Sequence, residues 1–195
     1  MIFKKVCAYL QERRISVSPA DVQMISSVTK HRIIPKHTIV MHQGKTVKKL
    51  FFLNEGIVRL FRVHEGSDYT LGLVSANDFI STHLYLLNGE PSSCALETLT
   101  DIEVLEWSKT DIEAIKKQVS KAYEIEQAIM HRLLSWLQDM QIDAVCLTAE
   151  ERYQKMLQQQ PEIVQTIPLK YIASFLGIHQ DSLSRIRKQV IKRPD

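Results

Sequence analysis

Short runs of β-branched and aromatic residues follow one another closely from about residue 31 to residue 107, and no other feature constrains the fold as strongly. Three of these runs are KLFFL (49–53), IVRLFRV (57–63) and YTLGLV (69–74). Segments rich in glycine, asparagine, aspartate and serine separate them, as turns do. Strands so close together in the sequence predict a compact antiparallel barrel or sandwich.

Two of the turns in this region predict hairpins. The segment FFLNEGIVRLF predicts a turn at Glu55-Gly56, where glycine can adopt a positive φ. The segment RLFRVHEGSDYTLGLV predicts a second turn at Gly66-Ser67-Asp68.

Helical patterns lie on both sides of the strand region. Before it, Ser18 is a candidate N-cap for a short helix over 18–29. After it, Ser108 is followed three residues later by Asp111, which predicts a capped helix start.

A stretch from about Lys121 to Val145 contains no glycine or proline and predicts one long helix. Its larger apolar residues recur every three or four positions and so form one stripe. Such a stripe packs either against the chain's own domain or against a second copy of the chain. Because a helix of about 25 residues is long for a chain of this size, we predict a homodimer interface. The predicted interface residues are Ile125, Ile129, Leu133, Trp136 and Met140.

The last segment predicts a helical hairpin with a glycine at its corner. Thr148 and Glu151 have the spacing of a capping box, and Pro161 ends the helix that they begin. Pro168 can begin the next helix, and Gly177 follows it where a tight turn needs a left-handed φ.

Each helix of this hairpin has an apolar face and the second also has a polar face. The predicted inward residues are Ile172, Ala173, Leu176, Leu183, Ile186 and Val190. The polar face of the second helix carries Gln180, Asp181, Ser184, Arg185 and Lys188. This is the arrangement of a helix-turn-helix, whose second helix enters the major groove of DNA. Arginine, glutamine and aspartate can each pair with base edges there.

The distribution of charge supports a polyanionic partner. Residues 1–147 carry 17 Lys+Arg and 17 Asp+Glu, whereas residues 148–195 carry 8 and 5 and so supply the whole net charge of +3. Within 170–193 the count is 6 against 1. A basic terminal segment is what binding to nucleic acid requires.

Other classes of protein are disfavoured. No apolar run approaches the roughly 18 residues of a membrane span, and the N-terminal segment lacks the apolar core of a secretory signal. The three cysteines are far apart and form no CxxC motif, which favours a reducing cytoplasm and disfavours a disulfide framework. The seven histidines form no HxH pair, and no nucleophile or phosphate-loop motif is present. We therefore expect no metal, no cofactor and no enzymatic activity.

Taken together, these segments make the chain similar to the Crp/Fnr family of bacterial transcription regulators. The matching segments are IVMHQGKTVKKLFFLNEGIVRLFRV (39–63), NDFIS (77–81), the helix over 121–145 and YIASFLGIHQDSLSRI (171–186). The resemblance implies an α+β fold with three parts. These are an N-terminal β jelly-roll barrel of the cyclic-nucleotide-binding type (1–108), a helical connector with a dimerisation helix (109–147) and a helix-turn-helix DNA-binding domain (148–195).

The resemblance also implies roles for individual residues. The residues placed where family members read bases are Gln180, Asp181 and Arg185. The residues placed near phosphates are Lys170, Ser182, Arg187 and Lys188, of which Arg187 can also point away from the DNA face.

The chain departs from the members that bind cyclic nucleotides. Thr82 stands where such members have the glutamate that holds the ribose, and Ser92 and Ser93 follow Pro91 where they have the phosphate-binding arginine. A buried phosphate without its cation costs several kcal/mol, so we expect no binding of cyclic AMP in the usual way. The N-terminal cysteine cluster of iron–sulfur members is missing. The chain reaches Asp195 without the winged hairpin that follows the recognition helix.

The sequence thus predicts a cytoplasmic, homodimeric regulator that binds double-stranded DNA in a sequence-specific manner. Its barrel is a sensor whose effector, if it has one, the sequence does not identify. The alternative is a ligand-sensing or scaffold module that does not bind DNA.

Overall fold

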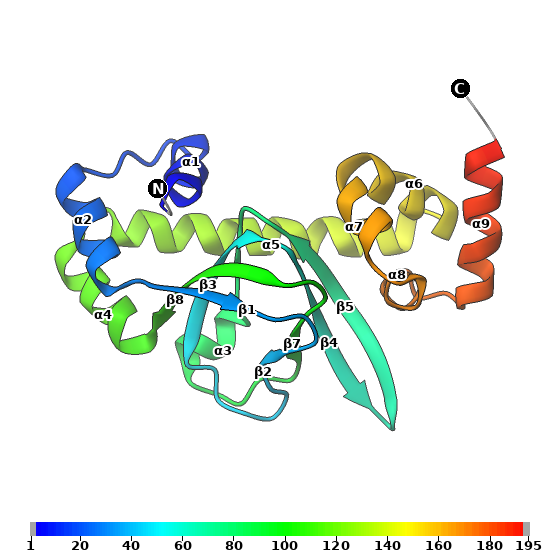
Figure 1. Ribbon diagram of the computed structural model, residues 1–195, viewed down its shortest axis with the longest axis horizontal. Helices are drawn as coiled ribbons and strands as arrows, with labels where there is room; N and C mark the ends of the chain where they lie inside the picture. The colour runs from blue at the N-terminus through cyan, green and yellow to red at the C-terminus, as the bar shows by residue number, and fades with distance from the viewer. Residues whose placement is uncertain (1–2, 193–195) are drawn as a thin grey trace.

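The computed structural model of the chain describes residues 3–192. A barrel of strands lies against one side of a long helix, with small helices at one end and a separate helical group at the other (Figure 1). The predicted α+β fold, with a barrel, a long helix and a C-terminal helical part, is confirmed.

Two four-stranded antiparallel sheets form the barrel, in the orders β1-β8-β3-β6 and β2-β7-β4-β5. The strands are β1 (Lys30–Ile34), β2 (Ile39–Met41), β3 (Lys49–Glu55), β4 (Ile57–His64), β5 (Ser67–Ser75), β6 (Asp78–Ile80), β7 (Ala95–Thr98) and β8 (Ile102–Ser108). Strand β3 lies in the middle of its sheet, and five consecutive residues from Leu50 to Asn54 are buried. Both faces of β3 are covered, since Tyr9 of an N-terminal helix packs edge-on against Phe52 with ring centroids 5.8 Å apart.

One predicted hairpin is confirmed and the other is wrong. Strands β4 and β5 pair from Ile57 to His64, but the turn lies at Glu65-Gly66 and not at Gly66-Ser67-Asp68, because Ser67 and Asp68 already pair in β5. Both turn residues have positive φ, as a tight hairpin requires. Strands β3 and β4, in contrast, belong to different sheets and do not pair. Gly56 turns the chain from one sheet to the other, and a Cβ there would lie 2.5 Å from the carbonyl oxygen of Asp101. The glycine marks a close approach of backbone rather than a hairpin turn.

Three helices begin at the predicted caps. The side chains of Ser18, Ser108 and Thr148 each accept a hydrogen bond from the backbone three residues on, and the last two form full capping boxes. The helix nearest the N-terminus was not predicted. The helices are α1 (Lys4–Glu12), α2 (Pro19–Val28), α3 (His83–Asn88), α4 (Lys109–Gln118), α5 (Ala122–Cys146), α6 (Ala149–Gln159), α7 (Pro161–Thr166), α8 (Leu169–Leu176) and α9 (Gln180–Lys192).

Two apolar clusters form the core of the described residues. The larger one joins the barrel to α1, α2, α4 and the first half of α5. The second one joins barrel residues Ile57, Leu73 and Leu99 to the core of α6–α9. The C-terminal helices are therefore packed directly onto the barrel. None of the helices within residues 3–192 has the length and apolar character of a membrane span.

Candidate nucleic-acid interface

The corner between α8 and α9 has the predicted geometry. Gly177 ends α8 in the left-handed conformation with φ 68°, and its N–H and that of Ile178 donate to carbonyl oxygens of the last turn of α8. The predicted inward residues are confirmed, because Ile172 and Leu183 are fully buried and Ala173 is nearly so. A small residue at 173 lets the two helices approach closely.

The outer face of α9 is polar and exposed. The three predicted base-reading residues Gln180, Asp181 and Arg185 are all exposed on this face. α9 lies at the extreme end of the molecule, away from the barrel (Figure 1). His179 precedes it, and its ring Nδ1 accepts a hydrogen bond from the backbone N–H of Asp181 at 3.3 Å. His179 therefore orients the first turn of α9, a contact that the sequence pattern did not indicate.

The four residues predicted to contact phosphates are not all exposed. Lys170, Ser182 and Lys188 are exposed, and the ammonium of Lys170 lies 4.7 Å from the centre of the Tyr171 ring. Arg187 is half-buried beside Tyr153 of α6. Burial raises the pKa of the Tyr153 hydroxyl, and the neighbouring Arg187 guanidinium offsets part of that shift. Arg187 thus lies on the inner side of α9.

The helix-turn-helix is held on the barrel by a buried arginine that sequence reasoning missed. Arg59 of β4 is only 4 % exposed, and its guanidinium forms hydrogen bonds of 2.6–2.7 Å with Asp68 and Glu97. It also lies between the rings of Phe61 and Tyr171, at 4.1 and 4.3 Å from their centres.

A second contact joins the same two parts. The backbone N–H of Thr70 in β5 donates to the Ser174 hydroxyl of α8 at 2.8 Å. With the Arg59 contacts, it fixes the direction of α8 and therefore of α9 relative to the barrel. The one sequence signal for this junction is Arg59, the first of two arginines in the apolar run IVRLFRV, since a charge buried in a strand needs partners.

The predicted dimer stripe on α5 faces the chain's own barrel. Ile125 and Ile129 pack in the barrel core, and Leu133 and Trp136 line a cavity of about 260 Å³ between α5 and the barrel. Trp136 lies so close to β5 that a Cβ on Gly72 would be 2.7 Å from its ring. In the structure these residues therefore pack against the chain's own domain, which is one of the two packings that their periodicity allows. Met140, the last of the five, is half-buried.

A different apolar stripe on α5 is free of the barrel. Its residues recur at heptad-like spacing and are Tyr123, Met130, Leu134, Leu137 and Val145, called the outer stripe below. Tyr123 and Val145 are 69 % and 80 % exposed, and Leu134 and Leu137 are 55 % and 45 % exposed. Sequence inspection favoured the neighbouring stripe because that one contains the larger and more regularly spaced residues.

Ser92, predicted to stand where cyclic-nucleotide-binding members have the phosphate-binding arginine, is buried and bonded internally. Ser92 is 1 % exposed, and its hydroxyl donates to the carbonyl oxygen of Cys94 at 2.8 Å. The hydroxyl of Thr82, where those members have a glutamate, is buried without a hydrogen-bond partner among the described residues. Ser93 accepts a hydrogen bond from the Tyr85 hydroxyl at 2.8 Å. These groups include no cation that would neutralise a phosphate.

Within residues 3–192 no three His, Cys, Asp or Glu side chains lie close enough together to hold a metal ion.

Comparison with known proteins gives the same architecture. Residues 31–119 match the family model described as "Cyclic nucleotide-binding domain". The structure of FixK2 from Bradyrhizobium japonicum superposes with a TM-score of 0.73 at 16 % identity, over 84 % of either chain. A putative transcriptional regulator of the Crp/Fnr family from Eubacterium rectale superposes with a TM-score of 0.69 at 18 % identity, over 92 % of this chain and 85 % of that one. The chain has the fold of the Crp/Fnr regulators.

A curated relative extends the similarity to sequence. The cyclic AMP receptor protein of Thermus thermophilus is 25 % identical over 176 residues, which cover 87 % of this chain and 81 % of the relative. The relatives found are regulators and not enzymes, in agreement with the prediction that this chain is no enzyme.

Proposed function

We propose that the chain is a sequence-specific transcription regulator that binds double-stranded DNA as a homodimer, with α9 in the major groove. The observation that carries the proposal is the exposed polar face of α9, held at a fixed angle by the Gly177 corner and by the Arg59 contacts. Arg185 would pair with a guanine, and Gln180 and Asp181 would read neighbouring bases. Lys170, Ser182 and Lys188 would contact phosphates and supply affinity without sequence information. Action in the cytoplasm is part of the proposal.

The homodimer is supported by the outer stripe of α5. Four of its five side chains are more than two-fifths exposed in the single chain, and they lie along one face of a 25-residue helix. A second copy of the same helix would bury this face in a two-fold arrangement, as in a coiled coil. The two α9 helices would then be related by the same two-fold axis and would read inverted half-sites about one helical turn apart.

Binding of cyclic AMP is not part of the proposed function. The buried Ser92 hydroxyl and the unpartnered Thr82 hydroxyl offer no positive charge to the cyclic phosphate. We expect isothermal titration calorimetry to give no heat of binding with cyclic AMP at millimolar concentration. Micromolar binding would contradict this part of the proposal and would indicate a second way of holding the phosphate.

The DNA-binding proposal is tested by comparing three alanine variants on an operator obtained by selection. Arg185→Ala should cost about 1–3 kcal/mol and abolish the preference at one base pair of each half-site. Lys188→Ala should weaken binding to all sequences equally and reduce the dependence of affinity on salt. Arg32→Ala, which removes an exposed cation from β1 far from α9, is the matched control and should leave both properties unchanged.

The result that would contradict the proposal is equally specific. If Arg185→Ala and Arg32→Ala bind DNA alike, and neither affinity falls steeply with salt, α9 does not contact DNA. The chain would then be a ligand-sensing or scaffold module.

A further inference from the structure

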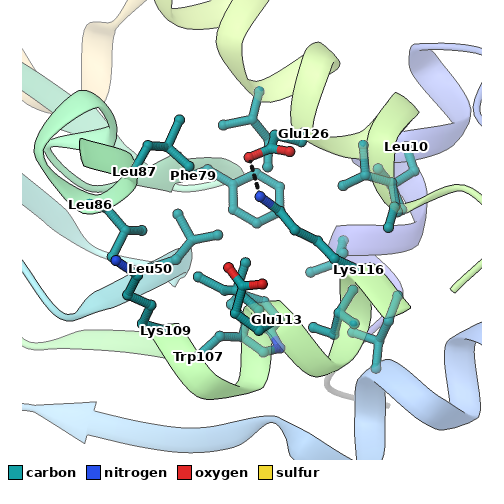
Figure 2. Close-up of a pocket in the computed structure, with 17 residues that line it drawn as sticks. Leu10, Leu50, Phe79, Leu86, Leu87, Trp107, Lys109, Glu113, Lys116 and Glu126 are labelled. Carbon is teal, nitrogen blue, oxygen red and sulfur yellow. Dashed lines mark ion pairs between the residues drawn. The ribbon is translucent and has the colours of Figure 1, made fainter. Parts of the chain in front are cut away.

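A separate cavity lies at the end of the barrel away from the helix-turn-helix, among α1, α2, α4 and the first turns of α5 (Figure 2). Its volume is about 160 Å³, and it shares only Phe79 and Ile129 with the cavity between the barrel and α5. Thr82, Ser92 and Ser93, the residues expected near a cyclic nucleotide, do not line it, whereas Leu86 and Leu87 of α3 do. Its lining is therefore distinct from Thr82, Ser92 and Ser93, although α3 lies beside both.

The body of this cavity is apolar. Its walls are the side chains of Leu10, Leu50, Phe79, Leu86, Trp107, Ile112, Ile115 and Ile129, with others of the same kind. Trp107 has its polar atom satisfied elsewhere, because the indole N–H donates to the Thr29 hydroxyl at 2.7 Å. An apolar cavity of about 150 Å³ in a protein core stays dry and accepts a benzene-sized molecule. The space therefore fits an apolar group of about six carbons.

A small number of charged groups converge on the same cavity. Figure 2 shows Lys116 reaching from α4 to Glu126 on α5, and the ammonium and carboxylate are 2.8 Å apart. Both side chains are largely covered, at 33 % and 25 % exposure. A lysine ammonium has three donors, so one bond to Glu126 leaves Lys116 able to donate to a second acceptor. Lys109 adds another ammonium and Glu113 another carboxylate, so the lining holds two side chains of each charge, of which Lys116 and Glu126 are already paired.

The backbone of α5 also favours a negatively charged ligand. Ala122 and Glu126 place the first turn of α5 against the cavity, and the N-terminal end of a helix favours an anion. An apolar space with a few convergent polar groups is the usual form of a small-molecule site.

We propose that this cavity binds a small carboxylic acid with an apolar body of about six carbons, whose carboxylate is held by Lys116. The ligand would contact the barrel, α4 and α5 together, and so it would stabilise the position of α5 on the barrel. This site goes beyond the proposed DNA binding and does not depend on it.

Three probes that have the same six-carbon chain and different head groups test the proposal on the full chain. Isothermal titration calorimetry with hexanoate, hexan-1-ol and hexylamine should show binding of hexanoate, with the alcohol at least about 10-fold weaker and the amine weaker still. Hexanoate should also raise the midpoint of thermal unfolding. Equal binding of the three probes, a preference for the amine, or no binding of hexanoate would each overturn the proposal.

Variants with a matched control place the ligand at this cavity. Lys116→Gln should weaken hexanoate binding about 5- to 10-fold, as expected for loss of a charge-assisted hydrogen bond at a partly exposed position. Lys117→Gln makes the same change on the next residue of α4, which is exposed and does not line the cavity, and should have no effect. Glu126→Gln removes the competing carboxylate and should strengthen binding.

A fourth variant separates loss of binding from loss of folding. Ala122→Leu fills the cavity and should abolish hexanoate binding without lowering the midpoint of thermal unfolding. If Lys116→Gln and Lys117→Gln weaken binding equally, or if Ala122→Leu folds and still binds hexanoate, the carboxylate lies elsewhere and the proposal fails.

Discussion

The two apolar stripes of α5 are similar in composition and differ in what they contact. The inner stripe, formed by Ile125, Ile129, Leu133 and Trp136, lies against the barrel, and Ile129 is only 8 % exposed. The outer stripe is free of the barrel, and Val145 at its end is 80 % exposed. Both stripes have helical spacing. A stripe on a helix therefore predicts that something covers it, but it does not identify which partner does so.

Residues of the barrel determine which stripe of α5 packs against it. Gly72 of β5 leaves space for the large ring of Trp136, and Asp78 at the start of β6 pairs with Arg132 at 3.1 Å. Both contacts depend on residues about 60 positions away in the sequence. The outer stripe has no such partner among residues 3–192, which is why we assign it to a second copy.

The largest effect is expected from charges in the outer stripe. The double variant Leu134→Glu/Leu137→Glu would bury four like charges in a two-fold interface, which costs several kcal/mol. The dissociation constant of the dimer should rise more than about 100-fold, measured by analytical ultracentrifugation. The control His131→Glu/Ser135→Glu adds two glutamates one helical turn apart on an exposed flank of α5 and should remain dimeric. An unchanged dimer in the first variant would show that the outer stripe is not the interface.

Truncation of the inner stripe should instead destabilise the fold of each chain. Ile129→Ala removes a buried side chain from the barrel core and should lower the free energy of unfolding by about 2–4 kcal/mol in urea titrations. Val145→Ala, an outer-stripe change made in the dimer-breaking background so that association does not contribute, should change it by less than about 0.5 kcal/mol. Similar losses at the two positions would remove the distinction between the stripes.

Disturbing the contact between β5 and Trp136 should change the free energy of unfolding by a smaller amount. Gly72→Ala places a Cβ 2.7 Å from the Trp136 ring, so the ring must move, at a cost of about 1–3 kcal/mol. Trp136→Ala removes the clash and also the apolar contact. In a double-mutant cycle the combined variant should be more stable than the sum of the single losses. Additive losses would mean that Trp136 does not lie against Gly72.

The smallest effect concerns the ion pair at the inner face. Burial raises the pKa of Asp78, and the neighbouring Arg132 guanidinium offsets part of that shift. Because the folded pKa is above the unfolded value, ionised Asp78 destabilises the native state at neutral pH. That cost appears as the pH rises through the window from about 3.9 to the folded pKa, and it is absent below that window.

Asp78→Asn should therefore be more stable than the parent chain at pH 7 and equal to it below about pH 4. Unfolding titrations at a series of pH values measure the difference. Asp139→Asn, on the exposed side of α5, is the control. A variant that is less stable at pH 7 would show that the bond to Arg132 outweighs the cost of burial.

Local features of this fold could be predicted from the sequence, because neighbouring residues determine them. The caps at Ser108 and Thr148, the long helix and the Gly177 corner all depend on contacts within a few residues, and all are confirmed. The exposed position of Arg185 followed in the same way from helical spacing.

Features that depend on distant partners could not be predicted. The chain crosses between sheets at Gly56 because the backbone of Asp101, far along the sequence, passes within 2.5 Å of where a Cβ would lie. The inner position of Arg187 depends on Tyr153 of another helix. The junction between Arg59 and Tyr171 joins strands to a helix more than 100 residues later. In each case the local pattern was compatible with more than one arrangement.

The central claim is that two copies of α9 read DNA in a fixed two-fold relation. In-vitro selection of random duplex DNA by the purified protein tests it most directly. The account predicts an enriched sequence of two inverted half-sites about one helical turn apart, which is lost with Arg185→Ala. A pool that stays random, both with the purified protein and after addition of cell extract that would supply an effector, would contradict it.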